Sequence, residues 1–231
     1  MIYAIGDLHF DFSKEKPMDI FGDKWVKHEE KIINNWKSLV KGEDLVILPG
    51  DISWALKLDT ARYDLERIDK LPGKKVIIKG NHDYWWASLN KLNKLELETI
   101  FFLQNNSYKY NDIGISGTRG WIAKDNDDFK ADDEKIFERE LQRLRLSLEN
   151  LEGVNHKIAI MHYPPFNMDL SPNEFVEIMK AHGVKTCLYG HLHAEGHKYA
   201  VEGSIEGINF HCVSSDYIDF KPKLVVSDNT E

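Results

Sequence analysis

The sequence predicts a layered α/β fold, built either on one mixed sheet or on two sheets packed between helices. Three observations support this prediction. Short apolar runs with the length of buried strands recur along the chain. Amphipathic helical patterns separate many of these runs in the first two thirds of the sequence. In the last third the apolar runs lie closer together, so strands there are expected to follow one another more directly.

The predicted strands are apolar, rich in β-branched residues, and bounded by polar residues or glycine. They cover residues 2–5, 45–48, 76–78, 113–116, 158–161, 187–189, 208–213 and 224–226. The only two cysteines of the chain, Cys187 and Cys212, lie in two of these runs. This position predicts buried reduced thiols rather than a disulfide or metal ligands.

Helices are predicted where apolar residues recur at helical spacing. Four such faces are formed by Ile32, Ile33, Trp36, Leu39 and Val40; by Ala61, Leu65, Ile68 and Leu71; by Trp85, Leu89, Leu92 and Leu95; and by Ile136, Phe137, Leu141, Leu144, Leu148 and Leu151. A fifth helix is predicted to begin at Ser171-Pro172-Asn173-Glu174, which has the pattern of a capping box with Ser171 as the cap. Gly183 is expected to end it.

Length and composition predict one domain over residues 1–231. A chain of 231 residues with 42% hydrophobic residues buries enough surface to form a core without covalent cross-links. Residues 119–151 contain a polar excursion and then the longest predicted helix, which could cap a binding site. The acidic residues 125–133 fit either a solvated loop or a lid, and a solvated loop is the expectation.

The formal net charge of −8 opposes attraction to long nucleic acid or to an anionic membrane, though not to a nucleotide. The N-terminal residues MIYAIGDLHF lack the basic and apolar regions of a signal peptide. No apolar run has the length of a membrane span. A cytoplasmic location without a membrane partner is therefore expected.

Side chains with metal-binding chemistry follow five of the predicted strands. They are Asp7, His9, Asp51, Asn81, His162, His191 and His193. Ligands of α/β sheets bind at the carboxyl ends of strands, so these side chains are expected to converge. A turn would explain a single Asp or Asn, and a surface position a single His, but the repetition at five strand ends favours a metal centre.

The mixture of imidazole and oxygen ligands suits Mn, Fe, Zn or Co better than Ca or Mg. Seven side chains exceed the needs of one ion, so two divalent or trivalent transition-metal ions that share a bridging carboxylate are expected. Asp7 and His9, like His191 and His193, are two residues apart, and in extended chain both members of a pair point to the same side. Two such ions can activate water and hold a phosphoryl group.

His82 follows Asn81 and precedes the helical pattern of Trp85 and Leu89. At a helix N-terminus, where phosphate is favoured, it would be a general acid for phosphoester cleavage; the alternative is a residue that only caps the helix. Arg119 follows a predicted strand and is a candidate substrate-binding residue that could pair with phosphate through two hydrogen bonds. An exposed salt bridge is an equally good interpretation of Arg119.

Other polar and aromatic residues allow two interpretations each. Trp54, Trp85, Trp86 and Trp121 could form a stacking wall for a ring of the substrate, but core packing explains most such aromatics. Asp11 could hydrogen-bond a metal-binding residue or only form a turn.

The ordered blocks D-x-H, G-D, G-N-H-[DE], H and G-H-x-H span residues 7–193 and resemble the motifs of the calcineurin-like metallophosphoesterases. The resemblance implies a four-layer α/β/β/α sandwich in which two mixed sheets are flanked by helices. It implies one metal held by Asp7, His9, Asp51 and His193, and a second held by Asn81, His162 and His191 with Asp51 as the bridge. His82 matches the catalytic histidine, which protonates the leaving oxygen after in-line attack by a metal-bridging hydroxide.

The sequence differs from the protein Ser/Thr phosphatases of this superfamily, which carry G-D-x-x-D-R-G. Trp54 stands where those enzymes have an Asp, and Ala55 where they have an Arg. The third block ends in Asp83. The chain therefore resembles the smaller bacterial-type branch, which includes phosphodiesterases, nucleotidases and phosphomonoesterases, and a phosphoprotein substrate is not expected.

The expected function is hydrolysis of a small phosphoester, either a diester or a monoester and nucleotide-like compounds included, at a dinuclear metal centre. One alternative is a catalytically weak scaffold protein of the same fold, which should have lost His82 or several ligands. Another is a nuclease, which would need a basic groove that the net charge opposes.

Overall fold

Two mixed sheets form the centre of the protein, whose computed structural model describes residues 1–227. The first sheet has the order β11-β1-β2-β3-β4. Its strands are β11 (Lys223–Val226), β1 (Ile2–Ala4), β2 (Leu45–Leu48), β3 (Lys74–Ile77) and β4 (Ile100–Phe102). Only β11, at the edge, is antiparallel to its neighbour.

The second sheet has the order β5-β6-β7-β8-β10-β9. Its strands are β5 (Tyr108–Tyr110), β6 (Ile113–Thr118), β7 (His156–Met161), β8 (Thr186–Tyr189), β10 (Ile208–Cys212) and β9 (Gly203–Ile205). The four central strands are parallel, and the edge strands β5 and β9 are antiparallel. The parallel strands in each sheet are in register, so their carboxyl ends lie side by side.

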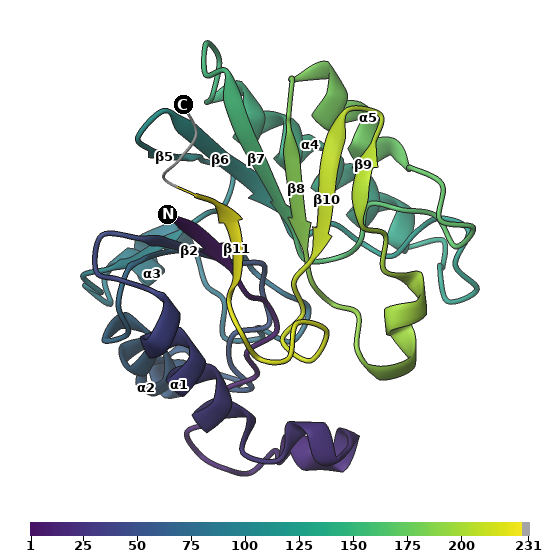
Figure 1. Ribbon diagram of the computed structural model, residues 1–231. Coiled ribbons are helices and arrows are strands. Elements are labelled where there is room, and N and C mark those ends of the chain that lie inside the picture. The colour runs from purple at the N-terminus through teal and green to yellow at the C-terminus, as the bar shows by residue number, and fades with distance from the viewer. Residues whose placement is uncertain (228–231) are drawn as a thin grey trace.

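Helices cover the outer face of each sheet. They are α1 (His28–Leu39), α2 (Leu58–Asp69), α3 (Leu89–Asn93), α4 (Asp133–Glu149) and α5 (Glu174–Ala181), with 3-10 turns η1 (Met18–Phe21), η2 (Asp23–Trp25) and η3 (Ala194–Tyr199). Figure 1 shows α1 and α2 on the outer side of the first sheet and α4 and α5 on the outer side of the second. The predicted four-layer α/β/β/α sandwich is confirmed.

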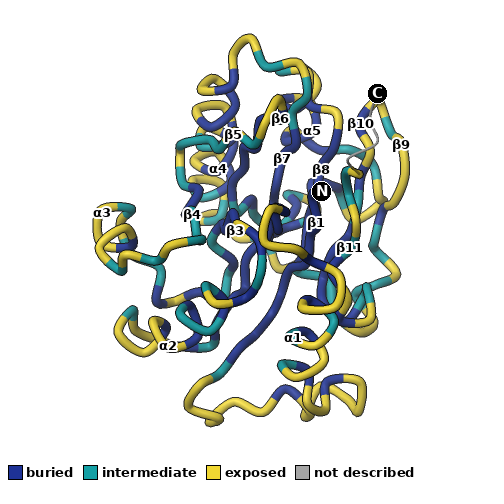
Figure 2. Tube along the Cα trace, turned by 60° about the vertical axis from the view of Figure 1, so that its left-hand side comes forward, coloured by how far each residue is buried: buried dark blue, intermediate teal, exposed yellow. Residues whose placement is uncertain are grey.

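Three apolar clusters fill the spaces between these layers. Ile2, Ala4 and Ile47 of the first sheet meet residues such as Ile158 and Ile160 of the second in the central cluster. The alternate residues of the same strands face the helices on either side. Because both faces of each sheet are buried, the central strands are continuous apolar runs, which Figure 2 shows as buried segments.

All eight predicted strands are present, but β4, β5 and β9 were not predicted. Each of the three has only three residues and lies at the edge of a sheet. β5 and β9 carry exposed residues, so neither forms an apolar run. Because these strands are short and lie at sheet edges, the search for apolar runs in the sequence did not predict them.

Two helix predictions need correction. The helix predicted over Trp85–Leu95 is only α3, because Trp85 and Trp86 precede it in irregular chain. Asn173, not Ser171, caps α5: its side-chain oxygen accepts a hydrogen bond from the Phe175 N–H at 3.1 Å. The Ser171 hydroxyl instead donates to Asp169.

Cys187 and Cys212 are buried free thiols, as predicted. Within residues 1–227, no helix is long and apolar enough to cross a membrane.

Candidate metal centre

The candidate ligands lie where the parallel strands of the two sheets end. β1 leads into Asp7 and His9, and β2 into Asp51, so the first sheet contributes these three together with Asn81 after β3. The second sheet contributes His162 after β7, and His191 and His193 after β8. The sequence patterns were therefore right that five strand ends supply these side chains.

The backbone at these positions is unusual. Asp7, His9, Asp51 and His191 have φ values of 56°, 47°, 53° and 73°, in the left-handed region that costs non-glycine residues about 1–3 kcal/mol each. This region turns the chain sharply after each strand and directs the side chains toward a common point. Clustering of such conformations is typical of functional sites.

Glycines allow the loops to approach one another. A Cβ atom on Gly80 would overlap the carboxylate of Asp51, and one on Gly190 would overlap the carboxylate of Asp7. Only glycine permits this close contact between backbone and carboxylate, and these two glycines directly precede Asn81 and His191.

The seven side chains converge into two overlapping groups. In the first group, His193 Nε2 lies 3.4 Å from His9 Nε2 and 3.5 Å from Asp7 Oδ1. In the second, Asn81 Oδ1 lies 2.5 Å from His162 Nε2 and 3.0 Å from His191 Nδ1.

Asp51 joins the two groups. Its Oδ2 atom is 3.8 Å from His9 Nε2 and 3.6 Å from His162 Nε2. One carboxylate thus reaches ligands of both groups.

The chemistry of these donors fits two metal ions. His9 Nε2 faces His193 Nε2 at 3.4 Å, and His191 Nδ1 faces His162 Nε2 at 3.3 Å. Nitrogen atoms that face one another in pairs beside buried carboxylates form the mixed N/O donor set that transition metals prefer. Among residues 1–227, His9 Nδ1 is buried without a hydrogen-bond partner, so no second hydrogen bond in this part of the chain explains the orientation of its ring.

The burial and mutual repulsion of the carboxylates also favour the binding of cations at this site. Burial and the charge of Asp7 raise the pKa of Asp51 to about 8. Burial and the charge of His162 lower the pKa of His191 to about 3, so this imidazole is neutral, the form that binds metal. Two adjacent buried carboxylates repel each other, and positive ions between them would offset this repulsion.

Asp216 orients His193, one of the candidate ligands, and the sequence analysis did not identify it. Its Oδ1 accepts a hydrogen bond from His193 Nδ1 at 2.8 Å, which leaves Nε2 to face the centre. Its Oδ2 accepts from the Ala194 N–H at 3.2 Å and lies 3.1 Å from His197. A carboxylate behind a ligand imidazole fixes its tautomer and raises its basicity. The available signal was an Asp shortly after a predicted strand, as at the other ligand positions.

Asp83 and Pro49 hold other parts of the centre in place. The buried Asp83 carboxylate accepts hydrogen bonds from the backbone N–H groups of Asp51 and Gly80 at 2.9 and 2.8 Å. The Pro49 carbonyl accepts from His162 Nδ1 at 2.9 Å, so Nε2 of His162 faces the ligands. The last residue of the G-N-H-D block therefore supports the loop that carries Asp51.

His82 lies beside the ligands, but not at a helix N-terminus as predicted. Helix α3 begins only at Leu89. The His82 N–H instead donates to Asp51 Oδ1 at 2.8 Å, and its ring centre is 5.9 Å from that of His9. A helix N-terminus therefore does not favour phosphate binding at His82. The prediction that His82 lies next to the candidate ligands agrees with the structure.

Trp54 contacts both His9 and His82. Its ring stacks on His9 at 4.8 Å and lies 4.5 Å from His82. The aromatic ring of Trp54 thus lines the position next to His82. Trp85 is instead buried in the core, so the four tryptophans do not form one wall.

Trp25 was not singled out from the sequence. Its ring contacts His193 and His9 edge-on, with centres 5.5 and 5.9 Å apart. No local pattern distinguishes this tryptophan from one that packs in the core.

Arg119 and Asp11 have clear environments. The Arg119 side chain is 14% exposed, lies 3.7 Å from the Glu140 carboxylate and covers the Trp121 ring at 4.3 Å. It is therefore not an exposed salt bridge. Asp11 accepts hydrogen bonds from the backbone of Ser13 and Lys16, and so forms a turn.

Comparison with known proteins gives one family match. A family model described as calcineurin-like phosphoesterase matches residues 1–195. Phosphopantetheinyl hydrolase from Mycobacterium tuberculosis has a similar structure, with 14% identity and a TM-score of 0.58 over 100% of this chain and 97% of that one. A protein of unknown function from Aquifex aeolicus shares 20% identity with a TM-score of 0.50 over 96% and 94%. These likenesses show the fold. No protein with a curated description matches the sequence.

Proposed function

The chain belongs to the calcineurin-like phosphoesterase family, metal-dependent hydrolases with a dinuclear centre, and from this premise we propose that it hydrolyses a small phosphodiester or phosphomonoester. The observation that carries the proposal is the convergence of seven ligand-type side chains from both sheets, with His82 beside them.

We assign the ligands to two ions. Asp7, His9, Asp51 and His193 would hold the first, and Asn81, His162 and His191 would hold the second with Asp51 as the bridge. The position of Asp51 Oδ2 between His9 and His162 supports this bridging role. Mn, Fe or Zn are the proposed metals because the donors mix imidazole with oxygen.

When bound, the ions supply Lewis acidity toward water and toward the phosphoryl oxygens. The chain itself supplies orientation and a proton. Asp216 and the Pro49 carbonyl fix the tautomers of His193 and His162, and Asp83 holds the loop of Asp51. Water is then proposed to attack phosphorus opposite the leaving oxygen.

His82 is the proposed general acid. Burial and the neighbouring His162 and His193 lower its pKa, whereas a bound anionic phosphoester would favour its protonated form. The Trp54 ring is tilted against the His82 ring with centres 4.5 Å apart, and such an aromatic neighbour would stabilise the imidazolium. The backbone N–H of His82 donates a hydrogen bond to Asp51, and this bond fixes the backbone that carries the His82 ring.

Hydrolysis of bis(p-nitrophenyl) phosphate and p-nitrophenyl phosphate tests the proposal. Purified protein should turn over at least one ester with added Mn²⁺, Zn²⁺ or Fe²⁺, and a chelator should abolish the activity. Elemental analysis of the same sample should find about two transition-metal ions per chain. If neither ester were hydrolysed with any of the three metals, the proposal would be refuted.

The alternatives have less support. A scaffold protein would be expected to have lost His82 or several ligands, and all eight side chains are present and close together. A nuclease is opposed by the formal charge of −8. We also propose the cytoplasm as the location, which the two unpaired thiols support.

A further inference from the structure

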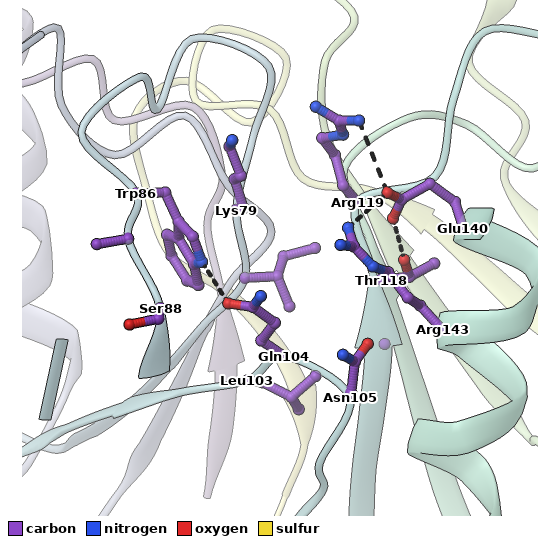
Figure 3. A pocket seen from close by; sticks show the side chains of 13 residues that line it. Lys79, Trp86, Ser88, Leu103, Gln104, Asn105, Thr118, Arg119, Glu140 and Arg143 are labelled. Atoms are coloured by element: carbon purple, nitrogen blue, oxygen red, sulfur yellow. Dashed lines mark hydrogen bonds and ion pairs between the residues drawn. The ribbon is translucent and has the colours of Figure 1, made fainter. Parts of the chain in front are cut away.

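A cavity of about 290 Å³ opens at the seam between the two sheets. We call it the basic pocket and define it by Lys79, Gln104, Arg119, Glu140 and Arg143, which all line it (Figure 3). One wall is formed by the segments that come directly after β3 and β4 in the chain. The other wall is formed by the end of β6 and by α4. The proposed roles of the metal ligands and His82 make no use of this cavity.

Positive charge dominates the basic pocket. Glu140 is fully buried, and its carboxylate lies 2.7 Å from Arg143 and 3.7 Å from Arg119. The three cations Lys79, Arg119 and Arg143 against this one carboxylate leave an excess of two positive charges, although the chain carries a formal charge of −8. A positive recess in an acidic protein concentrates anions.

Three side chains of the basic pocket have hydrogen-bond donors that are not used within the described part of the protein, while the Glu140 carboxylate and Gln104 Oε1 accept hydrogen bonds. Gln104 Oε1 accepts a hydrogen bond from Trp86 Nε1 at 2.8 Å, which orients the amide, and the two N–H donors of the Gln104 NH₂ group remain for a ligand. Arg119 Nε is buried and has no hydrogen-bond partner in the part of the chain that the structure describes. In residues 1–227, no ion pair or hydrogen bond involves the Lys79 ammonium. Such an array fits an anion with several oxygen atoms.

The basic pocket is tied to the metal-ligand loops through the backbone. The Arg119 carbonyl accepts a hydrogen bond from the N–H of His162 at 3.1 Å, and Lys79 precedes Asn81 by two residues. Figure 3 shows Lys79 and Arg119 extending from opposite walls toward the same end of the pocket. Because β3 and β6 both end there, this is the side on which the ligands gather.

We infer that the basic pocket binds a second phosphate group of the substrate, separate from the phosphoester that is cleaved. Arg119 and Arg143 provide forked guanidinium donors suited to phosphate oxygens, and Lys79 adds a point charge. Glu140 acts as a positioning residue that holds both guanidinium groups. The inference rests on the proposed function and narrows the substrates to small molecules with two phosphates.

Matched substrates test the inference on metal-loaded protein. Fructose 1,6-bisphosphate is compared with fructose 6-phosphate, and adenosine 3′,5′-bisphosphate with adenosine 5′-monophosphate. In at least one pair, the bisphosphate should have a kcat/KM at least about tenfold higher, the effect of one charge-assisted hydrogen bond or more. Equal values within both pairs would overturn the inference.

Lys79→Gln is the main variant because it removes a charge without unpairing Glu140. The preference for the bisphosphate should fall about tenfold, through KM rather than kcat. Arg145→Ala is the matched control, since Arg145 is an exposed cation on α4 outside the basic pocket, and the preference should stay at the wild-type value. A preference unchanged in Lys79→Gln would contradict the inference.

Binding of inorganic phosphate separates this inference from the proposed function. Titration of the purified protein followed by ³¹P NMR should reveal a Lys79-dependent site that is weakened at least about tenfold in Lys79→Gln and intact in Arg145→Ala. If this site is found but no ester is hydrolysed, the basic pocket stands and the proposed function fails. If esters are hydrolysed but phosphate binds Lys79→Gln as it binds the wild type, only the second-phosphate inference fails.

Discussion

Replacing Asp216 with Asn should weaken binding of the first metal ion. Asp216 Oδ1 accepts the hydrogen bond from His193 Nδ1 at 2.8 Å, and Oδ2 lies 3.1 Å from His197. The substitution keeps the size of the side chain and an oxygen that can accept from Nδ1. It removes the negative charge that makes His193 a stronger ligand.

The expected loss is about 10–100-fold in metal affinity, the range found when a carboxylate behind a ligand imidazole is removed. This corresponds to about 1.4–2.8 kcal/mol. Asp216→Ala also removes the acceptor that orients the His193 ring, so its loss should exceed that of Asp216→Asn. The difference between the two variants separates the effect of charge from that of orientation.

Competition with a chromophoric chelator measures the affinity, and elemental analysis measures the metal retained after dialysis. Asp219→Asn is the control, because Asp219 lies in the same loop but is 74% exposed and pairs with Lys24 on the surface. Its metal affinity should not change. Thermal unfolding of each variant checks that the fold is retained. Wild-type affinity in both Asp216 variants would refute the role assigned to Asp216.

Three further predictions concern other parts of the molecule. His82→Ala should lower kcat by about 10²–10⁴-fold with metal content unchanged, because a general acid is removed but no ligand; loss of metal from this variant would contradict the division of roles. Burial lowers the pKa of Lys75 to about 8, below its ordinary value of 10.5, so the unfolded chain binds more protons between these values. Between about pH 8 and pH 10.5, the urea concentration at the unfolding midpoint should therefore rise with pH more in the wild type than in Lys75→Met. If the midpoints of the two proteins changed with pH in parallel, the lowered pKa of Lys75 would be refuted. Burial raises the pKa of the Cys187 and Cys212 thiols, so Ellman's reagent should label neither in the native protein and both in urea; rapid labelling of the native protein would show that the thiols are accessible.

The central strands could be predicted because both faces of each sheet are covered. Burial on both sides requires continuous apolar runs such as Leu45–Leu48, and such runs are visible without structural information. The edge strands β5 and β9 have exposed residues and three-residue lengths, so their sequences resemble loops. These two segments are strands because they pair with the neighbouring strands β6 and β10.

The helix before α3 was predicted wrongly because side-chain contacts prevailed over apolar spacing. Trp85 Nε1 donates to Asp83 at 3.0 Å and Trp86 Nε1 to Gln104 at 2.8 Å. These bonds hold the two tryptophans in irregular chain, on the segment that links His82 to α3. The partner Gln104 lies beyond the next strand, so helical spacing alone could not reveal the contact.

The motifs and strand ends of the sequence determined the family, the layered fold and the candidate ligand side chains, because these depend on residues close together in the chain. The tertiary structure decided which of these side chains meet. His9 and His193 face each other across 184 positions, and Asp216 reaches His193 from a third segment. Such contacts follow from the order of strands in two separate sheets, which local patterns do not encode. For the same reason, only the folded chain brings Lys79 and Arg119 to opposite walls of the basic pocket.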